Sequence, residues 1–295
     1  MEKILVIGAT IVDIMMYIDA LPSSGDDIVA SNELVSVGGC ALNVANVLRA
    51  FDVPFDLLSP IGVGKNAELI RQSLTQKNID ILLDVGQADN GHCLTLVEKS
   101  GERTFITLLG VESNISPNWF DVINPLDYTK VYVCGYDIEA DTNNAILNFL
   151  EHNSHLELIF APSPRITYIQ KSKINKMFKL SKFIHLNKPE ILNFTNKLTV
   201  EDAVLALDTD ATIVVTLGPE GTILYNKKTF ITITTQAVTP IDTSGAGDSH
   251  LGGFIVGLAL GKSHIRATNL AHNIAKQVVQ TKGSEFIKKQ GESYE

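Results

Sequence analysis

The sequence predicts a doubly wound α/β domain, in which helices cover both faces of a mostly parallel sheet. Apolar runs of strand length lie at residues 3–9, 55–62, 130–135, 156–162, 183–187 and 212–218. Between most of these runs the apolar residues recur with helical spacing, as in residues 41–51, 66–78, 144–153 and 201–207. Strands that are apolar on both faces and alternate with helices are typical of a parallel sheet buried between two helical layers.

Composition limits the domain count and the class of partner. The chain has 295 residues, of which 45% are hydrophobic and 19% charged, and it contains no clear linker, so we expect one domain over residues 1–295. Its formal net charge of −9 leaves no basic stripe, which argues against nucleic acid as a partner. Cys40, Cys93 and Cys134 are far apart and form no C-x-x-C pair, so we expect neither disulfides nor a zinc site.

The apolar run before Asp13 is too short for a signal peptide, and it fits a first buried strand better. No other run reaches the roughly 18 apolar residues that a membrane-spanning helix needs. We therefore expect a cytoplasmic protein that does not enter a membrane, and the unpaired cysteines fit a reducing compartment.

Two segments interrupt the alternation of strands and helices. Residues 25–37 and 92–110 have strand character with no helix inside them, and Ser100 and Gly101 suit a hairpin turn in the second segment. These strands are interpreted as a small antiparallel sheet that covers a site as a lid. A plain extension of the main sheet is the alternative.

The stretch DTSGAGDSHLGGF, residues 242–254, is the first candidate for a functional site. It lies between a strand-like segment and an apolar helical one, so residues 243–247 should form the turn that opens a helix. Such a turn offers unpaired N–H groups and a partial positive charge to an anion, and glycines let the backbone approach it closely. Asp248 follows directly, where a carboxylate could take a proton from an attacking hydroxyl while the turn stabilises a transferring phosphoryl group. The alternative is a glycine-rich helix start with a solvated Asp248.

Two motifs resemble the signatures of the ribokinase-like (PfkB) carbohydrate kinases. DTSGAGD resembles the C-terminal signature D-T-x-G-A-G-D, and GGCALNVA at residues 38–45 resembles the N-terminal signature G-G-x-x-x-N-x-A. The resemblance implies a three-layer α/β/α fold with a β-sheet lid, here residues 25–37 and 92–110. It also implies transfer of the γ-phosphoryl group of ATP to a hydroxyl of a small sugar or nucleoside, and dimerisation through the lid is common in the family.

The resemblance assigns roles at the reacting centre. Asp248 becomes the catalytic base and the backbone of Gly245, Ala246 and Gly247 the anion hole. The residues implied to contact the acceptor are Asp13, Gly38, Gly39 and Asn43. Arg103, in the segment expected to form the lid, could reach substrate or phosphate, or could be a surface charge.

The resemblance also assigns the nucleotide and metal residues. Asn187 and Glu190 would organise Mg²⁺ and its waters, although Glu190 also suits a helix start. The loop with Thr216, Gly218 and Gly221 would lie along the nucleotide or simply form a hairpin, and His272 or Asn273 would lie near adenine. Asp242 and Gly283 would hold a monovalent cation, which makes potassium a possible activator.

Departures from the family pattern affect the acceptor rather than the reaction. Ile11 and Cys40-Ala41 replace polar or basic residues that are frequent in relatives, and Asn66 and His250 also differ from the usual residues. A sugar kinase is therefore the main hypothesis and a nucleoside kinase the alternative. A sugar-binding protein without activity is disfavoured because the base and the anion hole are intact. GVGKN at residues 62–66 is not a P-loop and GATIVD at residues 8–13 is not a dinucleotide motif, so other nucleotide-binding classes do not fit.

Overall fold

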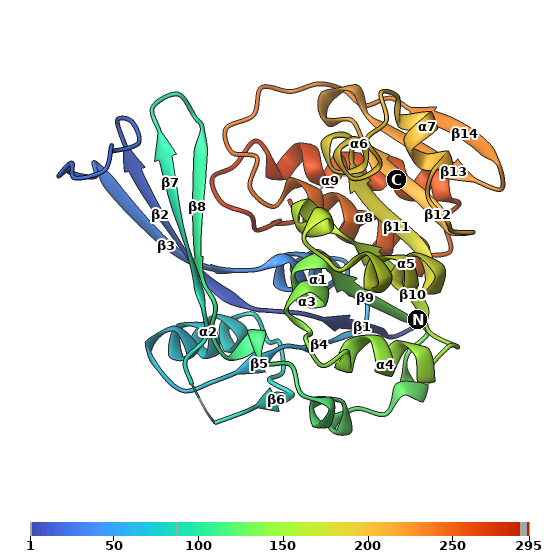
Figure 1. Cartoon of the computed structure of the whole chain (residues 1–295), viewed down its shortest axis with the longest axis horizontal. Helices are drawn as coiled ribbons and strands as arrows, with labels where there is room; N and C mark the ends of the chain where they lie inside the picture. The colour runs from blue at the N-terminus through green and yellow to red at the C-terminus, as the bar shows by residue number, and fades with distance from the viewer. Residues whose placement is uncertain (1, 87, 290–293, 295) are drawn as a thin grey trace.

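The computed structural model describes residues 2–86, 88–289 and 294, and it is built on one large, mostly parallel sheet (Figure 1). In spatial order this sheet contains β14 (Thr229–Ile233), β13 (Thr222–Asn226), β12 (Thr212–Thr216), β11 (Ser181–Asn187), β10 (Glu157–Ala161), β9 (Lys130–Cys134), β1 (Ile4–Ile7) and β4 (Phe55–Leu58). All neighbouring pairs are parallel except β12/β13 and β13/β14. The sheet passes through each of the predicted strand segments.

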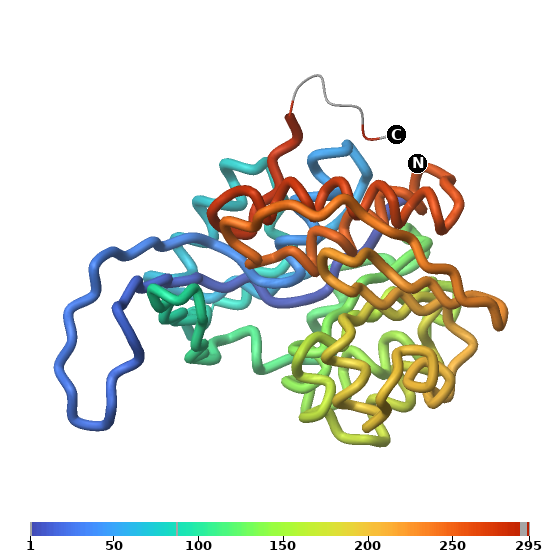
Figure 2. Tube along the Cα trace, turned by 90° about the horizontal axis from the view of Figure 1, so that it is seen from above, coloured from blue at the N-terminus to red at the C-terminus, as the bar shows by residue number. Residues whose placement is uncertain are grey.

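Helices cover both faces of the large sheet (Figure 2). One layer contains α1 (Cys40–Ala50), α8 (Ala246–Ala259) and α9 (His264–Val278), and the opposite layer contains α3 (Gly135–Ala140), α4 (Ala145–His152), α5 (Lys171–Leu180), α6 (Lys188–Thr195) and α7 (Val200–Leu205). The core is split accordingly: in β1, Ile4 and Val6 pack with α1 and α8, whereas Leu5 and Ile7 pack with α4 and α5. Successive side chains of a strand thus enter opposite apolar cores, as the continuous apolar strands predict. The predicted three-layer fold is observed.

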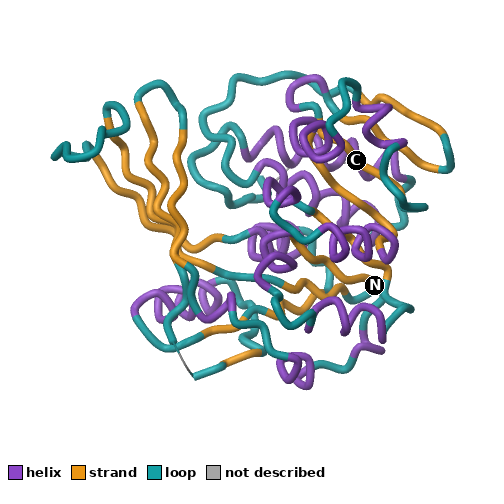
Figure 3. Tube along the Cα trace, viewed as in Figure 1, coloured by secondary structure: helices purple, strands orange, loops and turns teal. Residues whose placement is uncertain are grey.

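A second, four-stranded sheet projects from one edge of the large sheet (Figures 1 and 3). Its order is β3 (Asn32–Gly38), β2 (Ile11–Ile18), β7 (His92–Glu98) and β8 (Arg103–Leu108), and it is called the small sheet below. The hairpin between β7 and β8 turns at the predicted position, where Gly101 has a φ of 89°.

The predicted composition of the small sheet was incomplete. Residues 11–18 supply its second strand, which is antiparallel to β3 and parallel to β7, so the expectation of a wholly antiparallel sheet was wrong. Residues 25–31, which were expected to be extended within the lid, form a wholly exposed loop without strand pairing. The omission has a physical cause: β2 follows β1 after only a short turn, so the two strands resembled one apolar N-terminal segment in the sequence.

The remaining elements connect the two sheets: α2 (Lys65–Gln76), β5 (Pro60–Ile61) and β6 (Leu83–Asp84). Among the residues that the structure describes, no helix combines the length and the apolar character needed to cross a lipid bilayer. Parallel strands bring their carboxyl ends to one edge of the sheet, and the small sheet starts at that edge because β2 follows the end of β1. The edge between the two sheets is therefore where the predicted functional residues gather.

Candidate active site

The glycine-rich turn leads directly into α8, as the sequence predicts. Gly245 is the residue before the helix and has a left-handed φ of 67°. A Cβ atom at this position would lie 2.5 Å from the Cβ atom of Ser284, in the segment after α9. Glycine is therefore required here by its backbone conformation and by the close approach of that segment.

The turn carries N–H groups that have no partner in the described part of the chain. Those of Gly245, Gly247 and Asp248 donate to no described residue, while that of Ala246 makes a 3.3 Å bond to the Thr243 carbonyl oxygen. They lie at the start of a 14-residue helix, where the helix dipole adds partial positive charge. This combination suits the binding of an anion.

Asp248 lies in the first turn of α8 and is half-buried. Its carboxylate accepts a 2.9 Å hydrogen bond from Asn43 Nδ2. Burial raises the pKa of Asp248 to about 6, and Asn43 and the nearby thiol of Cys40 oppose that rise. The carboxylate is thus charged at neutral pH yet close to the range in which it exchanges a proton.

Asn43 and the two glycines before it hold α1 against the turn between β1 and β2. Asn43 is buried, and its Oδ1 accepts a 3.0 Å hydrogen bond from Ser284. A Cβ atom on Gly39 would lie 2.5 Å from the Ala9 carbonyl oxygen, and one on Gly38 would lie 2.1 Å from Asp13 Oδ2. Only glycines allow this approach, so the first signature has a geometric reason.

Asp13 belongs to β2 and lies in the same site as Asp248. Burial, followed by the negative charge of Asp248, raises the pKa of Asp13 to about 6. The structure therefore brings together five of the residues that the sequence predicted around the acceptor and the base: Asp13, Gly38, Gly39, Asn43 and Asp248.

Asn187 and Glu190 form a capping box at the start of α6. Glu190 N donates to Asn187 Oδ1 over 2.8 Å, and Asn187 N donates to Glu190 Oε2 over 2.9 Å. Burial is the main cause that raises the pKa of Glu190 to about 7, and the charge of Asp248 adds to it. The pair therefore has the helix-start role weighed in the sequence analysis, while the second carboxylate oxygen of Glu190 has no partner among the described residues.

The predicted nucleotide loop lies beside this pair, because Thr216 is the register partner of Asn187 across β12 and β11. Gly218 has a φ of 63° and Gly221 a φ of 108°, so both turn positions favour glycine. The strand β13 starts directly after the loop, which means that the hairpin alternative is also a correct description of residues 216–226.

His272 does not lie in an open groove. It is buried, and its Nε2 lies 2.8 Å from Thr222 Oγ1. The same threonine lies 3.4 Å from His250, whose Nδ1 lies 2.9 Å from His185. Burial lowers the pKa of His272 to about 4 and that of His185 to about 4, so these imidazoles are neutral inside the fold. The burial of His272 counts against the prediction that it lies beside adenine, whereas Asn273 is half-buried and its place near adenine stays a prediction.

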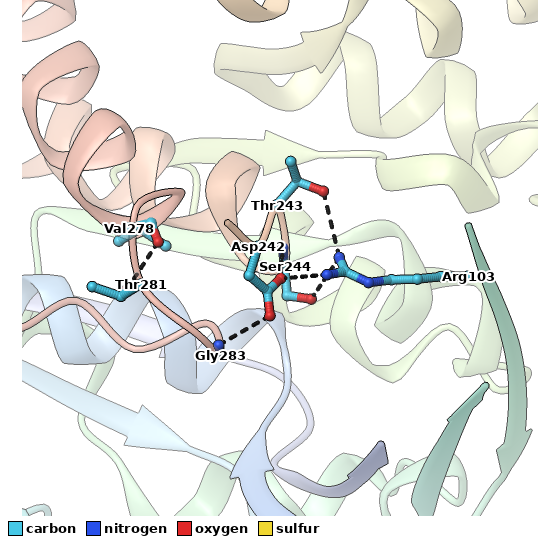
Figure 4. A network of polar contacts seen from close by, with 7 residues as sticks. All are labelled: Arg103, Asp242, Thr243, Ser244, Val278, Thr281 and Gly283. Atoms are coloured by element: carbon cyan, nitrogen blue, oxygen red, sulfur yellow. Dashed lines mark hydrogen bonds and ion pairs between the residues drawn. The ribbon is translucent and has the colours of Figure 1, made fainter. Parts of the chain in front are cut away.

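A polar network joins the turn to the small sheet (Figure 4). Arg103, the first residue of β8, makes a 2.7 Å ion pair with Asp242 and donates to Ser244 Oγ over 3.1 Å. Asp242 also accepts from Ser244 N over 2.7 Å and from Gly283 N over 3.0 Å. Arg103 is thus not a free surface charge, and its reach to substrate or phosphate stays a prediction.

Three contacts of cysteine thiols had no signal in the sequence. Cys40 was noted only as a departure, yet its thiol lies close to the carboxylate of Asp248 and to the thiol of Cys134, and both cysteines are free. Cys134 in turn donates to Asp137 over 2.9 Å, and the pKa of this buried carboxyl is raised to about 6, mainly by burial. The one feature of the sequence that could have indicated this series of contacts is the polar residues that follow the end of a strand.

Comparison with known proteins agrees with the geometry. The family model for pfkB family carbohydrate kinases matches residues 1–290. An uncharacterized sugar kinase, YegV, of Escherichia coli strain K12 is 29% identical over 290 residues, covering 96% of this chain and 90% of that protein. A nucleoside kinase of Methanocaldococcus jannaschii is 25% identical, with 96% of this chain and 92% of that protein covered.

Solved structures share the fold. The ribokinase of Thermotoga maritima superimposes with a TM-score of 0.84 at 23% identity, covering 97% of this chain and 95% of that one. The ribokinase of Arabidopsis thaliana, solved with ribose and ATP, gives a TM-score of 0.80 at 21% identity, with 96% and 94% covered. The predicted fold class is confirmed, and the match of the family model extends over nearly the whole chain. The protein belongs to the pfkB family of carbohydrate kinases.

Proposed function

We propose that this carbohydrate kinase transfers the γ-phosphoryl group of ATP to a hydroxyl of a small sugar, with Asp248 as the base. The observation that carries the proposal is the position of Asp248 beside the unpaired N–H groups at the start of α8. The base would take the hydroxyl proton as the new O–P bond forms and ADP leaves. The N–H groups at 245–248 would stabilise the charge on the transferring phosphoryl oxygens.

The acceptor would lie between Asp13 and Asp248. Asp13 can accept hydrogen bonds from sugar hydroxyls, and Gly38 leaves room for its carboxylate, because a Cβ atom there would lie 2.1 Å from Asp13 Oδ2. Asn43 contacts Asp248 directly, so it would orient the base in addition to lining the site. The small sheet would act as a lid that excludes water, which would otherwise accept the phosphoryl group.

The nucleotide would lie along the loop with Thr216, Gly218 and Gly221, and Asn273 would lie near its adenine ring. Mg²⁺ would bind near Asn187 and Glu190 and would supply positive charge to the phosphates. Its fit rests on Glu190 alone: one carboxylate oxygen has no partner among the described residues, and the pKa of this half-buried carboxyl is raised to about 7, so a nearby cation would stabilise its charged form. We do not extend the proposal to potassium, because both oxygens of Asp242 already accept hydrogen bonds.

A nucleoside acceptor is the second candidate. The nucleoside kinase of Methanocaldococcus jannaschii aligns over nearly the full length of the chain, and Ile11 leaves the acceptor side less polar than a sugar site usually is. A homodimer through the small sheet is also proposed. One of its two outer strands, β8, exposes Phe105, Ile106 and Leu108, which a second copy of the protein could cover.

The test is ADP release by the purified protein with Mg-ATP against hexoses, pentoses, phosphosugars and nucleosides, followed by mass spectrometry of the product. Phosphorylation of one sugar supports the main proposal, and phosphorylation of a nucleoside supports the second candidate. If ATP binds and no acceptor on the panel is phosphorylated, the kinase proposal is contradicted for these substrate classes.

A further inference from the structure

Arg103 is a half-buried cation held on the turn that opens α8. Its side chain is 18% exposed and that of Asp242 only 5%, so water screens this ion pair weakly. The guanidinium also contacts Thr243 Oγ1 at 3.4 Å and Ser244 Oγ at 3.1 Å. Figure 4 shows the guanidinium on one side of the Asp242 carboxylate and Gly283 on the other.

The residues around Asp242 do not fit a monovalent cation in this arrangement. Three donors engage the carboxylate: Oδ1 accepts from Ser244 N and Arg103, and Oδ2 accepts from Gly283 N. A cation would need oxygen ligands, whereas Gly283 presents its N–H group here. It would also lie against a guanidinium of the same charge, which a poorly solvated site makes costly.

We infer that Arg103 is a positioning residue that serves as the built-in cation of the anion-binding turn, so that the enzyme works without potassium. The inference rests on the proposed function, because it assigns the turn to phosphoryl transfer. A buried carboxylate requires a compensating positive charge, and Arg103 supplies it from the small sheet. Burial raises the pKa of Asp242, yet hydrogen bonds from Ser244 and Gly283 together with the charge of Arg103 outweigh burial and lower it overall.

The placement of Arg103 makes this charge conditional on the small sheet. Arg103 lies next to the hairpin turn of β7 and β8, at the end of β8 that is far from the large sheet. Arg103 and Asp242 are 139 positions apart in the sequence, so their ion pair forms only when the β7/β8 hairpin lies close to the turn before α8. Closure of the small sheet would therefore deliver the cation and order the turn in one step.

The test compares the wild type with Arg103→Ala, Arg103→Lys and Arg71→Ala in potassium and in tetramethylammonium, each at about 0.1 M to keep screening constant. Arg71 is a matched control because it also pairs with an aspartate, Asp84 at 2.8 Å, away from the turn. Turnover is measured on the acceptor found by the panel, and thermal unfolding is measured in the same salts without any acceptor.

We expect equal wild-type rates in the two salts. Arg103→Ala should lose roughly 10-fold to 100-fold in kcat in tetramethylammonium and should recover with potassium or added guanidinium ion, because either would fill the vacated charge site. Its Tm should rise by about 2–6 °C with potassium, whereas the Tm of the wild type, Arg103→Lys and Arg71→Ala should not.

Several results would overturn the inference. Potassium activation of the wild type would show that Arg103 does not replace the ion. Loss of activity in Arg103→Ala without recovery would assign Arg103 to the nucleotide or the acceptor instead. If no acceptor is phosphorylated, the kinase proposal fails separately, and the thermal unfolding measurement still tests Arg103. A Tm of the wild type that rises with potassium, or a Tm of Arg103→Ala that does not, contradicts the built-in cation.

Discussion

Replacement of Asn43 by alanine should move the pH dependence of the reaction. Asn43 Nδ2 donates to Asp248 at 2.9 Å and so stabilises the charged form of this carboxylate. A base must be deprotonated to accept a proton, so kcat/KM should fall as the pH decreases through the pKa of Asp248, which is about 6. Without the Asn43 donor the charged carboxylate of Asp248 is less stable, so the pKa of Asp248 must rise.

The size of the shift follows from the hydrogen bond. A bond from a neutral amide to a charged, poorly solvated group contributes about 1.5–3 kcal/mol, and about 1.4 kcal/mol corresponds to one pKa unit. The acid limb of Asn43→Ala should therefore lie about 1 to 2 pH units above that of the wild type. At pH 6 the variant should lose roughly tenfold more activity than it loses at pH 8.

The assay is coupled ADP release from about pH 5 to pH 9 at low acceptor concentration, so that it reports kcat/KM of the free enzyme. Asn46→Ala is the matched control, because Asn46 is equally buried on α1 but makes no bond to Asp248. Its acid limb should stay with that of the wild type. An unshifted limb in Asn43→Ala would refute the assignment of Asp248 as the titrating base, even if the overall rate fell.

Three further predictions concern the turn, the buried carboxyls and the dimer. Gly245→Ala should lower kcat and destabilise the fold by about 1–3 kcal/mol in urea titrations, because φ is 67° and the new Cβ would meet Ser284 at 2.5 Å; unchanged kinetics would contradict the geometry of the turn. Asp137 is costly to keep charged, since burial raises its pKa to about 6, but its two oxygens accept from Ala9 N and Cys134 Sγ, and the side-chain amide of Asp137→Asn would keep only one acceptor. The stability of Asp137→Asn relative to the wild type should therefore rise by up to about 3 kcal/mol from pH 4 to pH 7.5, because only the wild-type carboxyl must ionise in that range. A difference independent of pH would contradict it. Phe105→Asp should convert a dimer to a monomer in light scattering, and a monomeric wild type would remove the dimer proposal.

Local patterns predicted the parts of the site that local geometry determines. The Asn187 capping box and the two glycines before α1 lie at strand ends, and the glycine-rich turn lies directly before α8, so in each place a short motif fixes the backbone. The large sheet was predictable for the same reason, because buried parallel strands are continuous apolar runs.

Contacts between distant segments could not be read from the chain. The bond between Asn43 and Asp248 spans 205 positions, and that between Ser284 and Asn43 spans 241. His272 lies on α9 and packs against Thr222 of β13, which is 50 positions away. Its place in a helix alone therefore could not show whether it faces the interior or a ligand. The strand β2 was missed because its partners lie about 20 and 80 positions later in the chain, and nothing local separates it from β1.

The most direct test of the central claim is the rate of phosphorylated product formation by Asp248→Asn beside Asp208→Asn, an exposed aspartate in a surface ion pair. The account predicts that Asp248→Asn loses roughly 10²-fold to 10⁴-fold in kcat and still binds ATP, whereas Asp208→Asn keeps the wild-type rate. Near-normal turnover by Asp248→Asn would contradict the proposal that Asp248 takes the proton of the acceptor.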